Sequence, residues 1–436
     1  MKRVCLFAFL ALLSAGVVPS KAQETFLHSL PGSDVAGTSD LREGRRLFNL
    51  HFLDQPVGAK PGGGLGPLFN RNACSTCHPR GGRGAAPEGP DDPLLTGLVR
   101  LSVPGEAKNG GPLPHPRYGG QLNTRGIRGV PAEAEVSITY QVITGRYGDG
   151  TPYELRKPVL AFRDTAYGRL DDALTSLRIG QPIYGLGLLD AVSDDALEAW
   201  ADPEDRDDNG ISGRVNRVWN AALGGTVLGR FGWKANEPDL VQQTAAAFLG
   251  DIGITNPLFP RHDCGVGQEA CRKAAARIPE LLDAGIVRVA DYVRTIAPPA
   301  RRGAETTLDG EKLFEEAGCA LCHRPSFGKI QSSRSYLNGL QVDAFTDLLL
   351  HDMGEELADG RPDFEASGRE WRTPPLWGLG LAEAVHGRYA LLHDGRAQSL
   401  EEAILWHGGE AEASREAFRA FDFDQRAALI AFLKSL

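Results

Sequence analysis

The chain has 436 residues, 42 % of them hydrophobic, and a formal net charge of −9 from 47 basic and 56 acidic residues. This length exceeds the usual size of one domain, so we expect two. An acidic chain without a basic run is a poor candidate for binding nucleic acid, so we expect no such partner, and it suits basic proteins or small neutral substrates better.

Residues 1–22 are predicted to be a signal peptide. Lys2 and Arg3 precede an apolar run over residues 5–18, and Ser20-Lys21-Ala22 follows as a small-x-small cleavage site. The apolar run is shorter than the roughly 20 residues that a membrane-spanning helix needs. We therefore expect an exported, periplasmic protein without a membrane span.

The seven cysteines fall into three groups. Cys5 would leave with the signal peptide, and Cys264 and Cys271 in "CGVGQEAC" are expected to form a local disulfide in an oxidising compartment. The other four lie in "CSTCH" (74–78) and "CALCH" (319–323). This assignment leaves no free thiol and excludes cysteine catalysis.

Both CxxCH stretches match the pattern of c-type haem attachment. Two thiols one helical turn apart can each bond one vinyl group of the same porphyrin, and the adjacent His can reach the iron. A single motif could also be a redox dithiol or half of a zinc site, but two in an exported chain favour two covalently bound haems. The predicted attachment residues are Cys74, Cys77, His78, Cys319, Cys322 and His323.

Helical patterns recur around the two motifs. "GRRLF" (44–48) and "GEKLF" (310–314) precede them, and "GIVRVADYVRTIA" (285–297) and "QRAALIAFLKSL" (425–436) follow them. This order predicts a mainly α protein of two cytochrome c-like lobes, 23–300 and 301–436, joined by a polar linker at 298–307. Gly/Pro-rich loops over 81–131 are expected to enlarge the first lobe.

Longer stretches carry a family resemblance. "RIGQPIYGLGLLDAV", "GRFGWKANEPDLVQQTAAAFLGDIGIT", "WRTPPLWGLG" and "LLHDGRAQSLEEAILWHGGEA" resemble the bacterial di-haem cytochrome c peroxidase superfamily. They are closer to its di-haem oxidoreductase branch, often described as thiol oxidoreductases. The resemblance implies that a small redox protein exchanges electrons with the C-terminal haem and that peroxide or another small substrate reacts at the N-terminal haem.

The same resemblance implies roles for single residues near the first haem. "FGWKANEPDLVQQ" is similar to the stretch that carries the Trp between the haems, which makes Trp233 the candidate relay, although a core aromatic is the alternative. "GDIG" implies Asp251 as the distal acid, one methylene shorter than the Glu of the peroxidases. His115 in "LPHPRYGG" is the candidate sixth ligand, with a solvent-facing loop residue as the alternative.

Four side chains compete as sixth ligand of the C-terminal haem: His351, Met353, His393 and His407. The resemblance puts His407 at or beside the ligand position, so it is preferred. Met353 is the runner-up, and His393 matches a family residue that is structural or near a haem propionate. Because Met raises a haem potential relative to His, a bis-His haem would have the lower potential.

A further stretch, "DRDDNGIS" (205–212), resembles the start of a calcium-binding loop. Asp205, Asp207 and Asn209 alternate before Gly210, but Asn216 stands where a bidentate Glu is usual. A calcium ion and an acidic surface turn both remain open.

Three functions compete at this point: a peroxidase-like di-haem oxidoreductase, an electron carrier with both irons saturated, and an oxidative modifier of a protein partner. The sequence does not predict the oligomeric state.

Overall fold

The computed structural model describes residues 25–33, 38–54 and 64–436. The predicted signal peptide lies outside these residues. Helices account for 28 % of the residues and strands for 20 %. The expectation of a mainly α protein built as two cytochrome c-like lobes is therefore wrong, and the fold is a mixture of helices and small antiparallel sheets.

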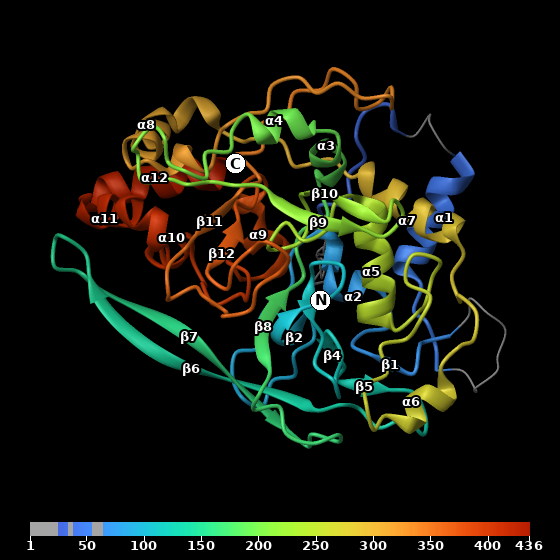
Figure 1. Cartoon of the computed structure of the whole chain (residues 1–436). Helices are drawn as coiled ribbons and strands as arrows, with labels where there is room; N and C mark the ends of the chain where they lie inside the picture. The colour runs from blue at the N-terminus through green and yellow to red at the C-terminus, as the bar shows by residue number, and fades with distance from the viewer. Residues whose placement is uncertain (1–24, 34–37, 55–63) are drawn as a thin grey trace, which may run out of the picture.

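The helices occupy both ends of the chain and its middle (Figure 1). They are α1 (Thr38–Asn49), α2 (Cys74–Cys77), α3 (Leu186–Asp190), α4 (Asp194–Glu198), α5 (Leu240–Ile252), α6 (Glu269–Ala274), α7 (Asp283–Arg294), α8 (Leu308–Glu316), α9 (Leu379–His386), α10 (Leu400–Leu405), α11 (Glu412–Ala420) and α12 (Phe423–Ser435).

All strand pairs are antiparallel, and most sheets have two strands. The strands are β1 (Leu68–Phe69), β2 (Gly97–Glu106), β3 (Pro112–Leu113), β4 (Gln121–Leu122), β5 (Arg125–Gly126), β6 (Glu135–Arg146), β7 (Pro152–Arg163), β8 (Leu174–Ile179), β9 (Asn216–Asn220), β10 (Gly225–Gly229), β11 (Leu350–Asp352) and β12 (Glu370–Arg372). Strand β2 pairs with β3, β4 and β8 in the largest sheet.

The longest strands form a hairpin that explains the error in fold class. β6 and β7 pair in register along twelve residues each. "EVSITYQVITGR" is rich in β-branched and aromatic residues, and "YGDG" supplies the turn. In Figure 1 the hairpin runs from the β2 sheet to α11, where Gly148 N–H donates to Arg419 O over 2.7 Å.

Two helix pairs frame the CxxCH motifs. α1 packs on α7 beside the first motif, and α8 packs on α12 beside the second. These are the helices that the sequence pattern predicted, and they lie at opposite sides of the molecule in Figure 1. The predicted helices were correct, and the large strand content between them was missed.

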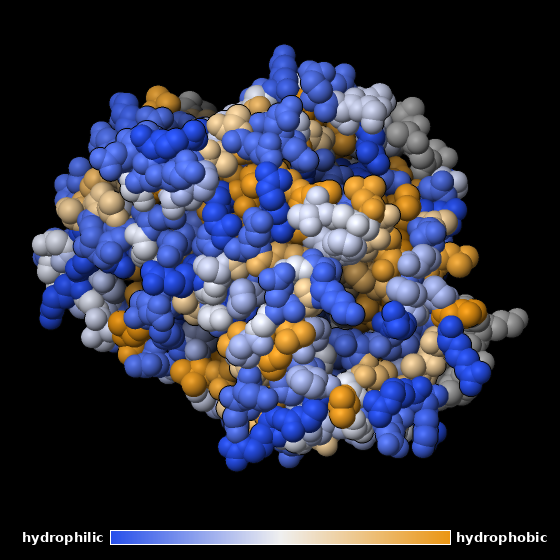
Figure 2. All heavy atoms as spheres, in the orientation of Figure 1, coloured by the Kyte–Doolittle hydropathy of each residue, from blue (hydrophilic) through white to orange (hydrophobic). Residues whose placement is uncertain are grey.

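The apolar side chains form two main buried clusters. One surrounds α1, α3, α5 and α7, and the other surrounds α8, α10 and α12. The face in Figure 2 is mostly hydrophilic, with apolar groups gathered around β10, α5 and α7. Within the described part of the chain, every helix is too short or too polar to cross a bilayer.

Candidate haem sites

Each CxxCH motif opens onto its own cavity. The C-terminal cavity encloses about 1320 Å³ of empty space out to its mouth, and the N-terminal cavity encloses about 1150 Å³. The first is lined by Cys319, Cys322 and His323, and the second by Cys74, Cys77 and His78. None of these four cysteines is in a disulfide, and all four are half-buried.

The histidines of the two motifs are oriented in the same way. His78 Nδ1 lies 2.6 Å from Gln181 O, and His323 Nδ1 lies 2.9 Å from Phe345 O. A carbonyl oxygen only accepts, so Nδ1 carries the proton and Nε2 keeps its lone pair for a metal. Burial lowers the pKa of His78 and lowers that of His323 to about 4, so both rings are neutral at pH 7, as iron ligation requires.

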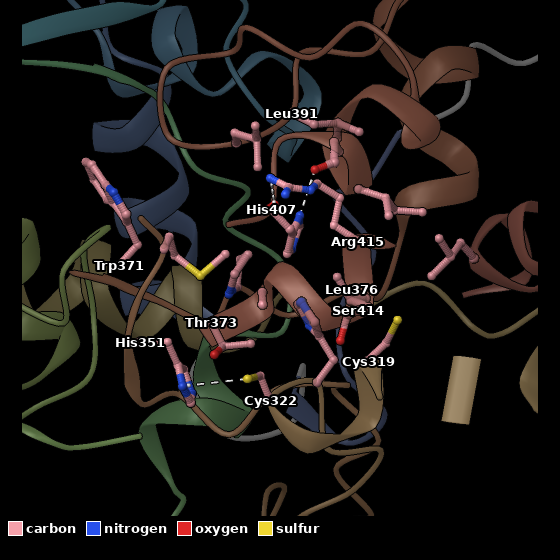
Figure 3. A pocket seen from close by; sticks show the side chains of 18 of the residues that line it. Cys319, Cys322, His351, Trp371, Thr373, Leu376, Leu391, His407, Ser414 and Arg415 are labelled. Carbon is pink, nitrogen blue, oxygen red and sulfur yellow. Dashed lines mark hydrogen bonds between the residues drawn. The ribbon is translucent and has the colours of Figure 1, made fainter. Parts of the chain in front are cut away.

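His407 repeats this arrangement on the other side of the C-terminal cavity. It follows α10, whose N-terminus is capped by Ser399, and its Nδ1 lies 2.7 Å from Ala403 O. Burial lowers the pKa of His407 as well. Figure 3 shows its ring reaching into the pocket from the side opposite Cys319 and Cys322. Met353 lines the same cavity and is half-buried.

His351 lines this cavity but has no nitrogen available for iron. Its Nε2 lies 2.9 Å from Asp347 Oδ2 and its Nδ1 lies 2.8 Å from Glu410 Oε2. Burial opposes protonation, but the hydrogen bonds to Asp347, Cys322 and Glu410 outweigh it and raise the pKa of His351 well above its usual value. Cys322, Asp347 and His351 are close enough to hold a metal ion, but the ring is already committed to the two carboxylates.

His393 is held by stacking. Its ring lies 3.7 Å from the ring of Trp371, centroid to centroid, at an interplanar angle of 10°. Burial lowers the pKa of His393 to about 4. It lines the C-terminal cavity together with Trp371.

The N-terminal cavity has a different wall opposite its motif. One face of α5 lines it with Gln243, Thr244 and Asp251. Asp251 Oδ1 accepts from Gln121 Nε2 over 2.9 Å. Among the described residues that line this cavity there is no Met and no His other than His78. The predicted sixth ligand, His115, is buried elsewhere, where its Nε2 lies 3.3 Å from Asp172 Oδ1.

Trp233 lines both cavities. It is 6 % exposed, and its Nε1 donates to Ile179 O over 3.0 Å. The segment 230–239 that carries it forms a turn between β10 and α5. The structure thus places Trp233 against both pockets that carry a CxxCH motif. An ordinary core aromatic, the alternative role, would not need to contact both.

Arginines that line the cavities give a test of whether a haem fits. Arg83 and Arg372 both line the C-terminal cavity, and neither has a carboxylate within ion-pair distance in the described part of the chain. Burial lowers the pKa of each to about 10, so they remain charged at pH 7. A buried cation needs an anionic partner, and haem propionates would supply one. The N-terminal cavity is also lined by two arginines: Arg178 is buried and pairs with Asp363 at 2.9 Å, and Arg100 is half-buried. The residues present therefore fit a haem in each cavity.

The predicted disulfide and the calcium loop have different outcomes. Cys264 and Cys271 are bonded to each other, as expected. In the loop, Asp205 accepts from the backbone N–H groups of Asn209 and Gly210. Asn216 is buried in β9, and its amide donates to Lys234 O and Asp363 O, so it faces away from the loop. Calcium binding stays a prediction, without Asn216 as a ligand.

Each of the two cavities is lined by a thiol pair, a neutral histidine and arginines, a set of residues that fits a protein with two haems. The family described as "Di-haem oxidoreductase, putative peroxidase" matches residues 20–436. The chain therefore belongs to this family of di-haem oxidoreductases, and the family predicted from the sequence is confirmed.

Two other comparisons add little. No curated protein matches the chain. Among solved structures, a hydrazine synthase of Kuenenia stuttgartiensis, pressurised with xenon, matches over 100 % of both chains at 12 % identity with a TM-score of 0.38. A likeness at this level carries no argument.

Sequence reasoning missed the arginines that line the cavities and Gln181. Arg178 and Gln181 lie in "RIGQP", and Arg372 lies in "WRTPP". Both stretches carried the family resemblance, but no local pattern distinguishes an arginine beside a haem cavity from one on the surface.

Proposed function

We propose that this chain is a periplasmic di-haem c-type oxidoreductase of peroxidase type. Hydrogen peroxide or another small substrate would react at the N-terminal haem, held by Cys74, Cys77 and His78. The observation that carries the proposal is an asymmetry. Besides its motif, the C-terminal cavity is lined by His407 and Met353, whereas the described lining of the N-terminal cavity offers no second His or Met.

The C-terminal site suits electron exchange with a small redox protein. We assign its proximal ligand to His323 and its sixth ligand to His407, because both rings donate Nδ1–H to a carbonyl and keep Nε2 free. A saturated iron changes oxidation state without binding substrate. Electrons would then pass to the N-terminal site by way of Trp233, which borders both cavities.

Reduction of peroxide to two waters consumes two electrons and two protons, and the haems supply the redox chemistry when bound. The chain must supply the proton transfer. Asp251 is the carboxyl group that lines the N-terminal cavity, and Gln121 holds its Oδ1 and so fixes its orientation. Asp251 would take a proton from one oxygen of peroxide and deliver it to the other oxygen, which leaves as water.

The test begins with EPR of the holoprotein. We expect a high-spin component from the N-terminal haem and a low-spin component from the C-terminal haem, with a spectral response to peroxide in the resting or half-reduced form. Two low-spin signals and no response would overturn the proposal in favour of a pure electron carrier.

Ligand variants test the second iron. His407→Ala should convert the low-spin signal to high-spin or replace it with a signal from a different ligand, whereas Met353→Ala should leave it unchanged. The reverse result would make Met353 the ligand and the haem His/Met.

An acid variant tests the first site. Asp251→Asn should lower peroxide turnover by roughly 10²–10⁴-fold, the usual contribution of a positioned acid–base group, with both EPR signals retained. Asp424→Asn, at an exposed carboxyl of α12, is the matched control and should leave turnover unchanged. Equal activity in the two variants would remove Asp251 from the mechanism.

A further inference from the structure

The segment 179–181, at and after the end of β8, lines the N-terminal cavity. Ile179 O accepts from Trp233 Nε1 over 3.0 Å, and two residues later Gln181 O lies 2.6 Å from His78 Nδ1. One short stretch of backbone therefore holds both the residue shared by the cavities and the proposed ligand of the N-terminal iron.

The side chain of Gln181 extends this connection. Its Oε1 accepts from Arg372 Nη2 over 3.1 Å. Gln181 lines the N-terminal cavity, while Arg372 lines the C-terminal cavity. Gln181 is thus joined to one site by its carbonyl and to the other by its amide.

Further hydrogen bonds hold Arg372 in place. Its Nε donates to Gly232 O over 2.9 Å, its Nη1 to Thr373 O over 3.1 Å, and its backbone N–H to Trp233 O over 3.0 Å. It is 4 % exposed. A side chain held this firmly restricts the position of the Gln181 amide that it contacts.

We propose that Arg372 and Gln181 are a pair of positioning residues that sets the potential of the N-terminal haem through the hydrogen bond to His78. A hydrogen bond from Nδ1–H makes an imidazole a stronger donor to its metal, and ligand donation tunes haem potential. The pair acts by keeping the Gln181 carbonyl in line with Nδ1. This inference rests on the proposed ligation of the N-terminal iron by His78.

The C-terminal site provides an internal reference. His323 Nδ1 also lies against a carbonyl, that of Phe345. The Phe345 side chain, however, packs against the rings of Phe314 and Phe432 and makes no polar link to the other cavity. A change at Gln181 should therefore move one potential and leave the other in place.

The experiment uses Gln181→Met, which keeps the length of the side chain and removes the acceptor. Potentials of both haems are measured by spectroelectrochemical titration of the holoprotein, and the iron–histidine stretch is measured by resonance Raman in the reduced state. We expect a higher N-terminal potential, a lower stretching frequency and an unchanged C-terminal potential. An unchanged N-terminal potential, or an equal shift of both haems, would overturn the inference.

Arg372→Met and the double variant complete a double-mutant cycle. The quantity measured in each variant is the potential of the N-terminal haem. If the two residues act as one unit, the shift in the double variant equals that of the larger single variant, whereas independent residues give additive shifts and overturn the pairing. Should Arg372→Met fail to mature, Gln181→Met alone still decides. Failure of the proposed ligation has a separate signature. If His78 ligates the N-terminal iron, wild type shows an iron–histidine stretch that His78→Gly lacks. If His78 is not the ligand, the two proteins do not differ in this stretch.

Discussion

Lys234, the residue after Trp233, is a fully buried cation. Its hydrogen-bond partners all come from the loop at 359–367. Its Nζ donates over 2.8 Å to each of Asp359 Oδ1, Arg361 O and Ser367 O. Its side chain is 0 % exposed, and it lies 4.5 Å from the centre of the Trp371 ring. Lys234 thereby ties the Trp233 segment to the loop at 359–367.

We predict that Lys234→Met destabilises the protein by about 3–5 kcal/mol, because it leaves Asp359 buried without this partner. Lys157→Met is the control, since its pair with Glu356 at 2.9 Å lies on the surface and should contribute about 0–1 kcal/mol. Urea denaturation of the holoproteins measures both changes. Similar losses in the two variants would contradict the structural role of the buried pair.

His351 shows how residue type alone misleads. Its two carboxylate partners keep it protonated, so its pKa is raised on folding. Its contribution to stability is fully present below the unfolded pKa near 6.5 and declines as the pH rises through the raised folded value.

We therefore predict that His351→Gln lowers stability most at slightly acidic pH and least at alkaline pH, while the EPR signals stay unchanged. Urea midpoints from pH 5.5 to 10 measure the difference, and His28→Gln, at an exposed site, is the control. A low-spin signal that disappears in His351→Gln would instead identify His351 as an iron ligand.

At the scale of elements, one glycine in each repeat decides how the paired helices pack. A Cβ on Gly44 of α1 would lie 2.0 Å from Arg288 O of α7, and one on Gly310 of α8 would lie 2.1 Å from Ala428 O of α12. The first residues of "GRRLF" and "GEKLF" thus occupy equivalent crossing points. Only glycine lets the two backbones approach this closely.

We predict that Gly44→Ala and Gly310→Ala lower the melting temperature, although Ala is favoured over Gly in a helix by about 1 kcal/mol. The new methyl group forces the helices apart, and overpacking of this kind costs about 1–3 kcal/mol. Gly285→Ala in α7 is the control, because its Cβ would meet the end of the Leu281 side chain, which can move. Thermal unfolding followed by circular dichroism decides, and equal stability of all three variants would refute the crossing-point role.

At the scale of the whole molecule, neither main cluster of buried apolar residues is confined to one predicted domain. The cluster around α1 and α7 also contains Leu337 and Trp377, and the cluster around α8 and α12 also contains Leu155 and Trp233. The hairpin tip adds a polar contact, Arg426 Nη2 to Asp149 Oδ2 at 2.7 Å. The division of the chain into two domains at 300/301 therefore stays a prediction.

We predict that cutting the linker leaves the molecule in one piece. A protease site inserted after Gly303, which is exposed, should yield two fragments that co-elute in native size-exclusion chromatography and separate only in denaturant. The shared clusters would hold them together. Fragments that separate under native conditions would show that the halves are independent domains.

The sequence by itself determined the features that depend on local chemistry. The two CxxCH motifs, the short-range Cys264–Cys271 disulfide and the amphipathic helices around each motif can be predicted because spacing of a few residues specifies them. The family could be predicted for the same reason, since its motifs are short and occur in order. The β6–β7 hairpin was also within reach, because its β-branched strands and "YGDG" turn are local signals.

Only the tertiary structure decided which distant residues meet. His351 and His407 both stood among the four candidate ligands in the sequence, with His407 preferred only by resemblance, but folding commits the His351 ring to Asp347 and Glu410 and leaves His407 with a free Nε2. Two further placements depend on contacts between segments tens to hundreds of residues apart. His115 lies away from the N-terminal cavity, and Trp233 lies against both cavities. Those contacts follow from the packing of the whole chain, and no spacing within the sequence encodes them.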